Sequence, residues 1–174
     1  QFIVDNQWVS LEQLDEVLHS GAKLALSETA KEKIAACRSY LDQEIAKADR
    51  LIYGINTGFG SLCNTAISTD DLEQLQNNLV LSHACGAGDR VPDEIVKRML
   101  LLKVLGLSHG ASGVQVETVE RLIFYYNNDI FPVVYQQGSL GASGDLAPLA
   151  HLVLPLIGEG TVRINNEEIP SAEM

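Results

Sequence analysis

The sequence predicts a mainly α-helical domain with a few short strands and one small β-hairpin. Apolar residues recur at helical spacing in several segments, and serine or proline residues stand where those segments begin. Strand-like patterns are confined to residues 2–4 and 161–169. The chain has 174 residues, of which 46% are apolar and 20% charged, so it suits one soluble, globular domain.

After a short strand at residues 2–4, three helices are expected, over residues 11–20, 28–49 and 69–86. Ser10 and Gln13 have the spacing of a capping box, and Ser27 is expected to cap the second helix. Gly86 and Gly88 are expected to end the third helix. Apolar stripes should face the core, namely Leu11, Leu14, Val17 and Leu18 in the first helix and Ile34, Tyr40, Leu41 and Ile45 in the second.

Three more helices are expected in the second half, over residues 92–107, 114–127 and 146–157. The first of these is apolar nearly all round, which predicts that it is buried. Pro155 is expected to kink the last one, because proline lacks the backbone N–H that a helix interior needs. Residues 161–169 alternate between apolar and polar around Asn165-Asn166, which predicts a hairpin.

Charge and cysteine content exclude several classes of protein. Twelve basic against 23 acidic residues give a net charge of −11, which repels nucleic acid, and no basic cluster opposes it. Three widely spaced cysteines indicate reduced thiols and a cytoplasmic protein, and no set of residues has the spacing of a metal site. The longest apolar run, residues 99–107, is too short to span a membrane.

The most unusual stretch is residues 137–151, where glycine and serine crowd ahead of an apolar helix start. Asp145 and Pro148 fit the opening of that helix. A loop of small residues that leads into a helix N-terminus can stabilise negative charge. A tight turn before a core helix explains the same composition equally well.

The triplet Ala142-Ser143-Gly144 can undergo a reaction of its own. Attack of the Gly144 nitrogen on the Ala142 carbonyl carbon, with loss of water, closes a five-membered imidazolone ring. Loss of a second water from Ser143 leaves an exocyclic methylidene, which is a strong electrophile. Glycine leaves the attacking nitrogen uncrowded, serine carries the departing hydroxyl, and alanine adds little bulk.

The run from Gly138 to His151 closely resembles the signature of the aromatic amino acid lyase family, which includes the histidine, phenylalanine and tyrosine ammonia-lyases. The resemblance implies that Ala142, Ser143 and Gly144 form the methylidene-imidazolone (MIO) group, with no external cofactor. It also implies the N-terminal part of a histidine ammonia-lyase-like (L-aspartase-like) helical fold. Leu140 is then expected beside the substrate, and Asp145 is expected to support ring formation.

A second glycine-rich stretch runs from Tyr53 to Gly60. It fails as a phosphate cradle, because Cys63 stands where a third glycine is needed and no Walker lysine follows. A plain connecting loop remains one interpretation. The stretch is also similar to the tyrosine loop of the lyase family. That resemblance implies that Tyr53 removes the β-proton of the substrate, that Gly60 lies near the prosthetic group, and that Asn56 supports the site.

Ser82 and His83 form a third candidate. A single histidine on an apolar helix face is often a satisfied core or interface residue. In the lyase family the corresponding pair contacts the substrate side chain, and Ser-His resembles the histidine ammonia-lyase version. His83 would then hydrogen-bond the imidazole of the substrate. The other histidines, His19, His109 and His151, are expected to be structural.

The resemblance covers about residues 9–174, whereas members of the family are roughly three times as long. The chain is therefore expected to be a single N-terminal domain, a fragment that is inactive alone. The family builds each active site from more than one subunit, which implies a homotetramer of the full-length enzyme. The expected reaction is elimination of ammonia from L-histidine to give urocanate.

Other functions stay open. The substrate could instead be tyrosine or phenylalanine, or the enzyme could be an aminomutase that returns ammonia to the β-carbon. A serine hydrolase would use Ser143 as its nucleophile, but the final glycine of a nucleophile elbow is missing and no convincing strand is expected before it. A non-catalytic helical fragment is the remaining alternative.

Overall fold

The computed structural model describes residues 1–47, 50–58, 60–68, 71–139 and 146–174. The α-helices are α1 (Leu11–His19), α2 (Glu28–Lys47), α3 (Leu72–His83), α4 (Asp93–Ser108), α5 (Val116–Asn127) and α6 (Leu146–Val153). The 3₁₀ helices are η1 (Gly60–Leu62), η3 (Leu154–Ile157) and η4 (Ser171–Glu173). The strands are β1 (Phe2–Val4), β2 (Leu24–Leu26), β3 (Ala87–Arg90), β4 (Phe131–Pro132), β5 (Tyr135–Gln137), β6 (Thr161–Ile164) and β7 (Glu167–Pro170). The expected mainly helical class is confirmed.

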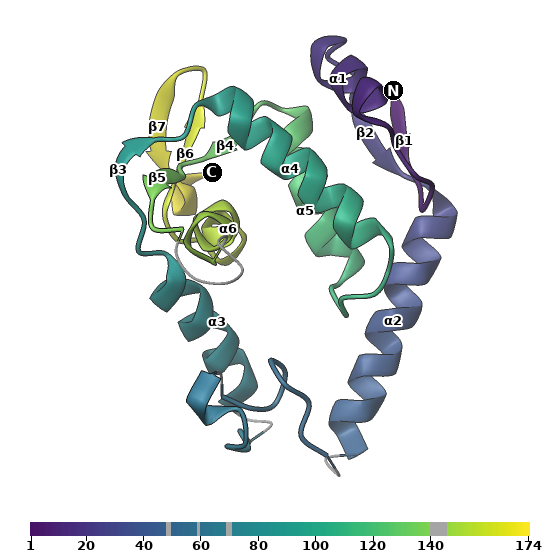
Figure 1. The fold of residues 1–174 in the computed structure, drawn as a ribbon, viewed down its shortest axis with the longest axis vertical. Coiled ribbons are helices and arrows are strands. Elements are labelled where there is room, and N and C mark those ends of the chain that lie inside the picture. Colours follow the sequence, from purple (N-terminus) through teal and green to yellow (C-terminus); the bar gives the residue numbers. More distant parts are fainter. Residues whose placement is uncertain (48–49, 59, 69–70, 140–145) are drawn as a thin grey trace.

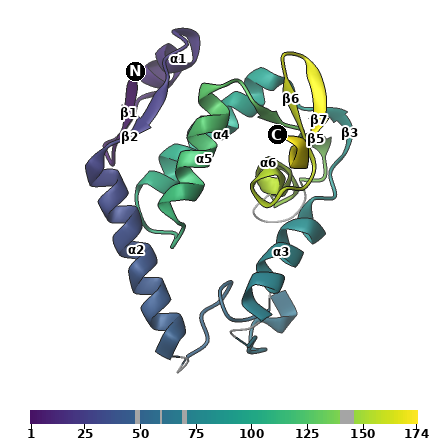
Figure 2. The ribbon, with the colours of Figure 1, turned by 180° about the vertical axis from the view of Figure 1, so that it is seen from behind.

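The helices α2 and α3 lie on opposite sides of the molecule (Figure 1). Between α2 and α6, α4 and α5 pack against each other, and both also contact α2. The strands β1 and β2 lie beside α1 at one end, whereas α6 and the remaining strands gather near the C-terminal end of α3 (Figure 2). The region around α6 is the part that holds the glycine-rich run.

Local signals explain most of the helix starts. Ser10 accepts from the backbone N–H of Gln13, and the Gln13 side chain accepts from that of Ser10, so the expected capping box is present. Ser27 caps α2 by accepting from the N–H of Ala30 at 3.0 Å. The strand β2 was not expected, and it pairs in parallel with β1. Its three residues are too few to show a pattern in the sequence.

The core is supplied mainly by α4 and α5. Their buried side chains are Val96, Leu100, Leu101, Val104, Val119, Leu122, Ile123, Tyr125 and Tyr126. In α4 these residues recur at helical spacing on one face, and Leu102 on another face is exposed. The expectation that α4 is buried therefore holds for one face of the helix and not for the whole of it. Leu11 and Tyr40 are also exposed, because no part of the described chain covers them.

The C-terminal elements follow the sequence closely. Asn165 and Asn166 both have positive φ, at 52° and 67°, as a two-residue hairpin turn between β6 and β7 requires. The α-helix ends at Val153 and gives way to the 3₁₀ helix η3, which has Pro155 near its start, so the helix does not continue with a kink. The pairing of β6 with β4 was not expected. This three-stranded sheet lies on the same side of the molecule as α6 (Figure 1).

Candidate active site

The glycine-rich run joins β5 to α6. Leu140, Ala142, Ser143, Gly144 and Asp145, which the sequence assigns to the site, lie outside the described residues. The structure does describe both flanks of this segment, up to Ser139 on one side and from Leu146 on the other. In the chain, the triplet is therefore bounded by a strand and by a helix N-terminus.

The flank that precedes the triplet makes a close backbone contact. Gly138 has φ of +128°, and a Cβ atom there would lie 3.0 Å from Cα of Gly86 and 3.2 Å from Cβ of Ala147. A Cβ on Gly86 would in turn lie 3.2 Å from the carbonyl oxygen of Gln137. Only glycine fits such approaches without displacing its neighbours. Three segments, namely the chain after α3, the end of β5 and the start of α6, therefore meet at backbone distance.

His151 on α6 lies at the same meeting point, and together with Gly86 and Gly138 it forms what we call the junction. Its side chain is buried, and Nε2 accepts a hydrogen bond of 2.9 Å from the backbone N–H of Gly86. Its ring stands edge-on to Tyr135, with centroids 5.2 Å apart. Burial lowers the pKa of His151 below its ordinary value of 6.5, because the charged form loses its hydration. The histidine therefore acts in its neutral form.

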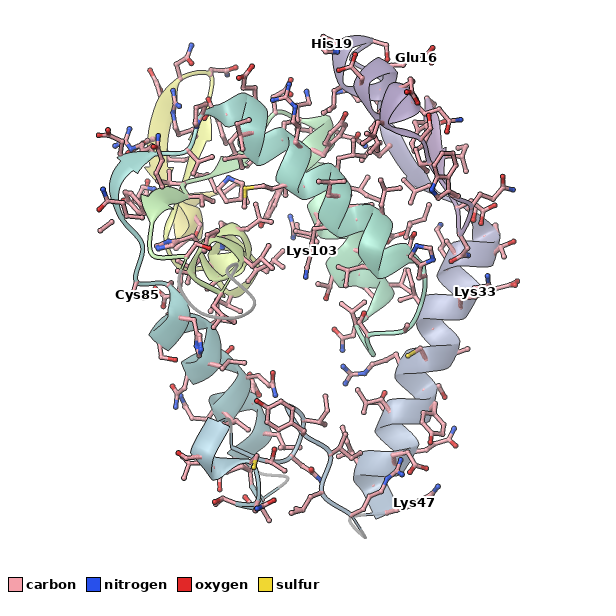
Figure 3. The ribbon with its side chains drawn as sticks, viewed as in Figure 1. Glu16, His19, Lys33, Lys47, Cys85 and Lys103 are labelled. Atoms are coloured by element: carbon pink, nitrogen blue, oxygen red, sulfur yellow. The ribbon has the colours of Figure 1, made fainter. Side chains whose placement is uncertain are left out.

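Ser82 and His83 lie at the C-terminal end of α3, which packs against α6. Cys85, two residues after His83, marks the segment that connects α3 to β3 (Figure 3). Nδ1 of His83 lies 2.8 Å from the carbonyl oxygen of Leu79, and a carbonyl can only accept, so Nδ1 carries the proton. In the neutral ring Nε2 is then an acceptor. The Ser82 hydroxyl donates to the same carbonyl at 3.0 Å.

The tyrosine loop lies at the other end of α3. Tyr53 is 63% exposed. Asn56 braces the turn around it, because its Oδ1 accepts from the N–H of Ile52 at 2.7 Å and its Nδ2 donates to the carbonyl of Arg50 at 3.0 Å. Gln76 on α3 donates to the carbonyl of Gly54 at 3.1 Å. Gly60 begins the 3₁₀ helix η1.

Among the predicted site residues that the structure describes, Ser82 and His83 lie together, and the Tyr53 loop is held at another position along α3. Ser82 and His83 lie at the end of α3 that packs on α6, directly after the triplet. The loop of Tyr53 is attached at Gln76, which lies seven residues before His83, or about 10 Å along the helix axis. A cavity of about 610 Å³ beside the loop is lined by Ile55 and Gln76 but by neither Tyr53 nor His83.

Sequence reasoning missed three residues of the junction. The sequence predicts only that Gly86 ends a helix and that His151 is structural, and it assigns no role to Gly138. The signal for His151 was its position eight residues after Ser143, within the same run. The contact with Gly86 is 65 residues distant in sequence, so no local pattern reveals it.

One argument against a serine hydrolase is wrong. A strand, β5, does precede the segment with Ser143, and the helix α6 follows it. The strand pairs with β3 alone, in a two-stranded antiparallel sheet, whereas a nucleophile elbow caps a strand of a larger α/β sheet. Within the described residues, no three His, Cys, Asp or Glu side chains gather as a metal site would need. None of the described helices is both long and apolar enough to cross a membrane.

A sequence model of the aromatic amino acid lyase family matches residues 9–174. The chain belongs to this family. Among curated relatives, a histidine ammonia-lyase of Deinococcus radiodurans is 49% identical over 166 residues, which are 95% of this chain and 32% of the relative. A histidine ammonia-lyase of Legionella pneumophila is 46% identical over 172 residues, which are 99% of this chain and 34% of the relative. The chain thus spans about a third of the length of these relatives.

Solved structures agree with the family. The histidine ammonia-lyase of Trypanosoma cruzi is 33% identical, with a TM-score of 0.84 over 98% of this chain and 32% of its own. Ergothionase from Treponema denticola, an ergothioneine-degrading enzyme, is 28% identical, with a TM-score of 0.92 over 99% of this chain and 34% of its own. The phenylalanine aminomutase of Pantoea agglomerans is 28% identical, with a TM-score of 0.90 over 99% of this chain and 33% of its own.

Proposed function

We propose that this chain is the N-terminal domain of a cytoplasmic histidine ammonia-lyase, which converts L-histidine to urocanate and ammonia. The observation that carries the proposal is the triplet Ala142-Ser143-Gly144, flanked by the junction of Gly138, Gly86 and His151. Curated relatives that are 45–49% identical over at least 95% of this chain carry that activity in their names. The high sequence identity to these relatives supports L-histidine as the substrate.

The flanks of the triplet fit a ring made from the chain itself. Gly138 leaves room where a Cβ would press on Gly86 and Ala147, so the chain can enter the segment at backbone distance from its neighbours. Contacts of this kind hold the two described flanks close to their neighbours, and cyclisation needs the Gly144 nitrogen close to the Ala142 carbonyl. Ala142, Ser143 and Gly144 would form the MIO group, which would supply an electron-poor carbon that accepts the substrate amine and improves it as a leaving group.

The chain contributes a base and a residue that recognises the side chain of the substrate, His83 (the reader). We assign Tyr53 as the base: its phenolate oxygen takes the β-proton, the α,β double bond forms, and the amine departs as ammonia. A phenolate is a stronger base than imidazole, which suits a weakly acidic C–H bond. His83 presents Nε2 as an acceptor, because its Nδ1 donates to Leu79, and an imidazole N–H of the substrate is a suitable donor. Ser82, Gly60 and Leu140 complete the surroundings of the substrate.

The proposed assembly is a homotetramer in which the tyrosine loop of one subunit reaches the triplet of another. The place where the loop is attached supports this proposal: Gln76, which bonds the loop, lies about two helical turns before His83 on α3. Asn56 supports such a reach, because it holds the turn of Tyr53 in shape.

Other substrates are the second candidate. The similarity to an ergothionase and to a phenylalanine aminomutase, at TM-scores of 0.92 and 0.90, shows that this backbone also serves relatives with those names. An ammonia-lyase acting on tyrosine or phenylalanine, or an aminomutase, would keep the triplet and Tyr53. It would differ in how Ser82 and His83 meet the side chain of the substrate.

The test uses a polypeptide of the relatives' full length that contains this chain (the full-length enzyme). Intact mass is expected to be lower by two waters, about 36 Da. Ultraviolet absorbance should detect urocanate from L-histidine, and L-tyrosine and L-phenylalanine should give no unsaturated acid. Ser143→Ala should remove both the mass loss and the ammonia release while helical content stays unchanged. A wild-type enzyme of unmodified mass that releases no ammonia, and whose hydrolytic activity a serine-directed phosphonate inhibits, would instead favour a serine hydrolase that uses Ser143.

A further inference from the structure

His151 is a buried polar side chain that the proposed chemistry does not use. It is 8% exposed, and Nε2 accepts from the Gly86 N–H at 2.9 Å. A backbone N–H only donates, so Nε2 carries no proton and the neutral ring has its proton on Nδ1. Burial favours the same neutral form by lowering the pKa of the group. A protonated ring would place N–H against N–H and break the contact.

The imidazole sits where three segments converge. It belongs to α6 and packs edge-on against Tyr135 of β5. It also accepts the hydrogen bond from Gly86, which lies three residues after the end of α3. A Cβ on Gly86 would lie 2.9 Å from Nε2 of His151, which is closer than an ordinary van der Waals contact. Any residue larger than glycine at this position would therefore press on the imidazole. The strand that leads into the triplet and the helix that leaves it are therefore tied to the end of α3.

A short chain of bonds connects this contact to the proposed reader. The N–H of Cys85 donates to the carbonyl of His83 at 2.9 Å, and Gly86 comes next in sequence. The N–H of Ala84 donates to Val80 at 3.1 Å, which fixes the last turn of α3. A change in the position of Gly86 is therefore passed to His83 through two residues of ordered backbone.

We propose that His151 is a positioning residue, whose bond to Gly86 sets the spacing between α6, which follows the triplet in the sequence, and His83 at the end of α3. It does not touch the substrate; it acts through Gly86 on the reader and through α6 on the triplet. This inference depends on the proposed function, because spacing matters only if both groups serve one substrate. A histidine that merely fills the core would tolerate any apolar side chain of similar size.

Two variants of the full-length enzyme separate these roles. His151→Leu keeps a side chain of similar volume but removes the acceptor, whereas His151→Gln retains an amide that can accept from Gly86. For His151→Leu we expect a smaller fraction with the two-water mass loss. We also expect a KM for L-histidine about five to ten times higher in the fraction that carries it, which is the size of a lost hydrogen bond. His151→Gln should restore most of both.

Asn127→Leu is the matched control. Asn127 also makes long-range hydrogen bonds from a partly buried side chain, to Leu24, but it lies on α5, at the N-terminal strands. This variant should lower the melting temperature while its mass loss and KM stay at wild-type values. If His151→Leu has wild-type ring content and KM, the inference is wrong while the proposed function stands. The inference is equally wrong if His151→Gln fails as fully as His151→Leu.

Failure of the proposed function gives a different result. Wild-type enzyme with no two-water mass loss and no ammonia release from L-histidine would overturn both proposals at once, whatever the variants do. The mass readout needs no substrate, so it distinguishes a loss of ring formation from a loss of binding.

Discussion

The two ends of α3 carry different parts of the proposed site and are built in different ways. At the N-terminal end, the Tyr53 loop is exposed, and Gln76 holds it through one hydrogen bond to Gly54. At the C-terminal end, Gly86 and His151 meet at contact distances near 3 Å around a buried imidazole. Under the proposed function, the segment that forms the ring is bounded by closely packed residues of one chain, whereas the proposed base stands on an exposed loop.

The largest expected effect separates the two ends directly. Tyr53→Phe in the full-length enzyme should lower kcat by about 10²–10⁴-fold, because the general base is lost. Ring content should stay at the wild-type level, because the proposed base stands on a loop separate from the triplet. Intact mass and steady-state kinetics measure the two quantities. A parallel loss of the two-water mass difference would show that the ends are not independent.

Mixing variants sharpens the same comparison. Tyr53→Phe and Ser143→Ala subunits, inactive separately, should recover about a quarter of wild-type activity after random reassembly, if each site joins a tyrosine loop and a triplet from different subunits. Sites formed within one subunit would recover nothing.

A pair of glycine substitutions tests how tightly the junction is packed. Gly86→Ala should cost about 1–3 kcal/mol of stability, because the added Cβ would lie 2.9 Å from Nε2 of His151. Gly106→Ala in α4 is the control: its Cβ would have nothing within 4 Å, so it should stabilise by about 0.4–1 kcal/mol. Chemical denaturation measures both. If Gly86→Ala leaves the free energy of unfolding unchanged, the junction yields easily and is not rigid.

The smallest expected effect is on acid stability. Burial lowers the pKa of His151 in the folded protein, so between that value and the ordinary 6.5 the unfolded chain binds more protons. The contribution of His151 is therefore complete above about pH 6.5 and declines as the pH falls toward the lowered pKa. His151→Gln should remove this component, so the difference between wild type and variant should shrink on acidification. Urea denaturation on both sides of the ordinary pKa measures it; a constant difference contradicts the assignment.

Much of the fold was predictable because residues close together in the sequence determine where its helices begin and where its hairpin turns. Ser10 with Gln13, Ser27 and Asn165-Asn166 each define an element boundary through contacts between near neighbours in sequence. The short strands β2, β3, β4 and β5 were missed, because two to four residues carry no periodicity and their pairing depends on distant segments.

The candidate site also contains residues that a local sequence pattern indicates and a contact that depends on distant segments. The triplet, Tyr53 and His83 could be proposed as site residues because each lies in a run of unusual composition that resembles a family motif. The bracing role of Asn56 also lies within one turn of its partners. The link from His151 to Gly86 joins residues 65 positions apart and depends on how α6 packs against α3, so the sequence alone did not reveal it.

The side chain of Asn127 has a consequence for how the chain folds during synthesis. It holds both the N–H and the carbonyl of Leu24, at 2.7 and 2.9 Å, across 103 positions. At about 5–20 residues per second, a ribosome needs about 5–20 s to make that span. A two-stranded pair such as β1 and β2 is marginal alone, so during this interval these strands lack the two hydrogen bonds that Asn127 later supplies.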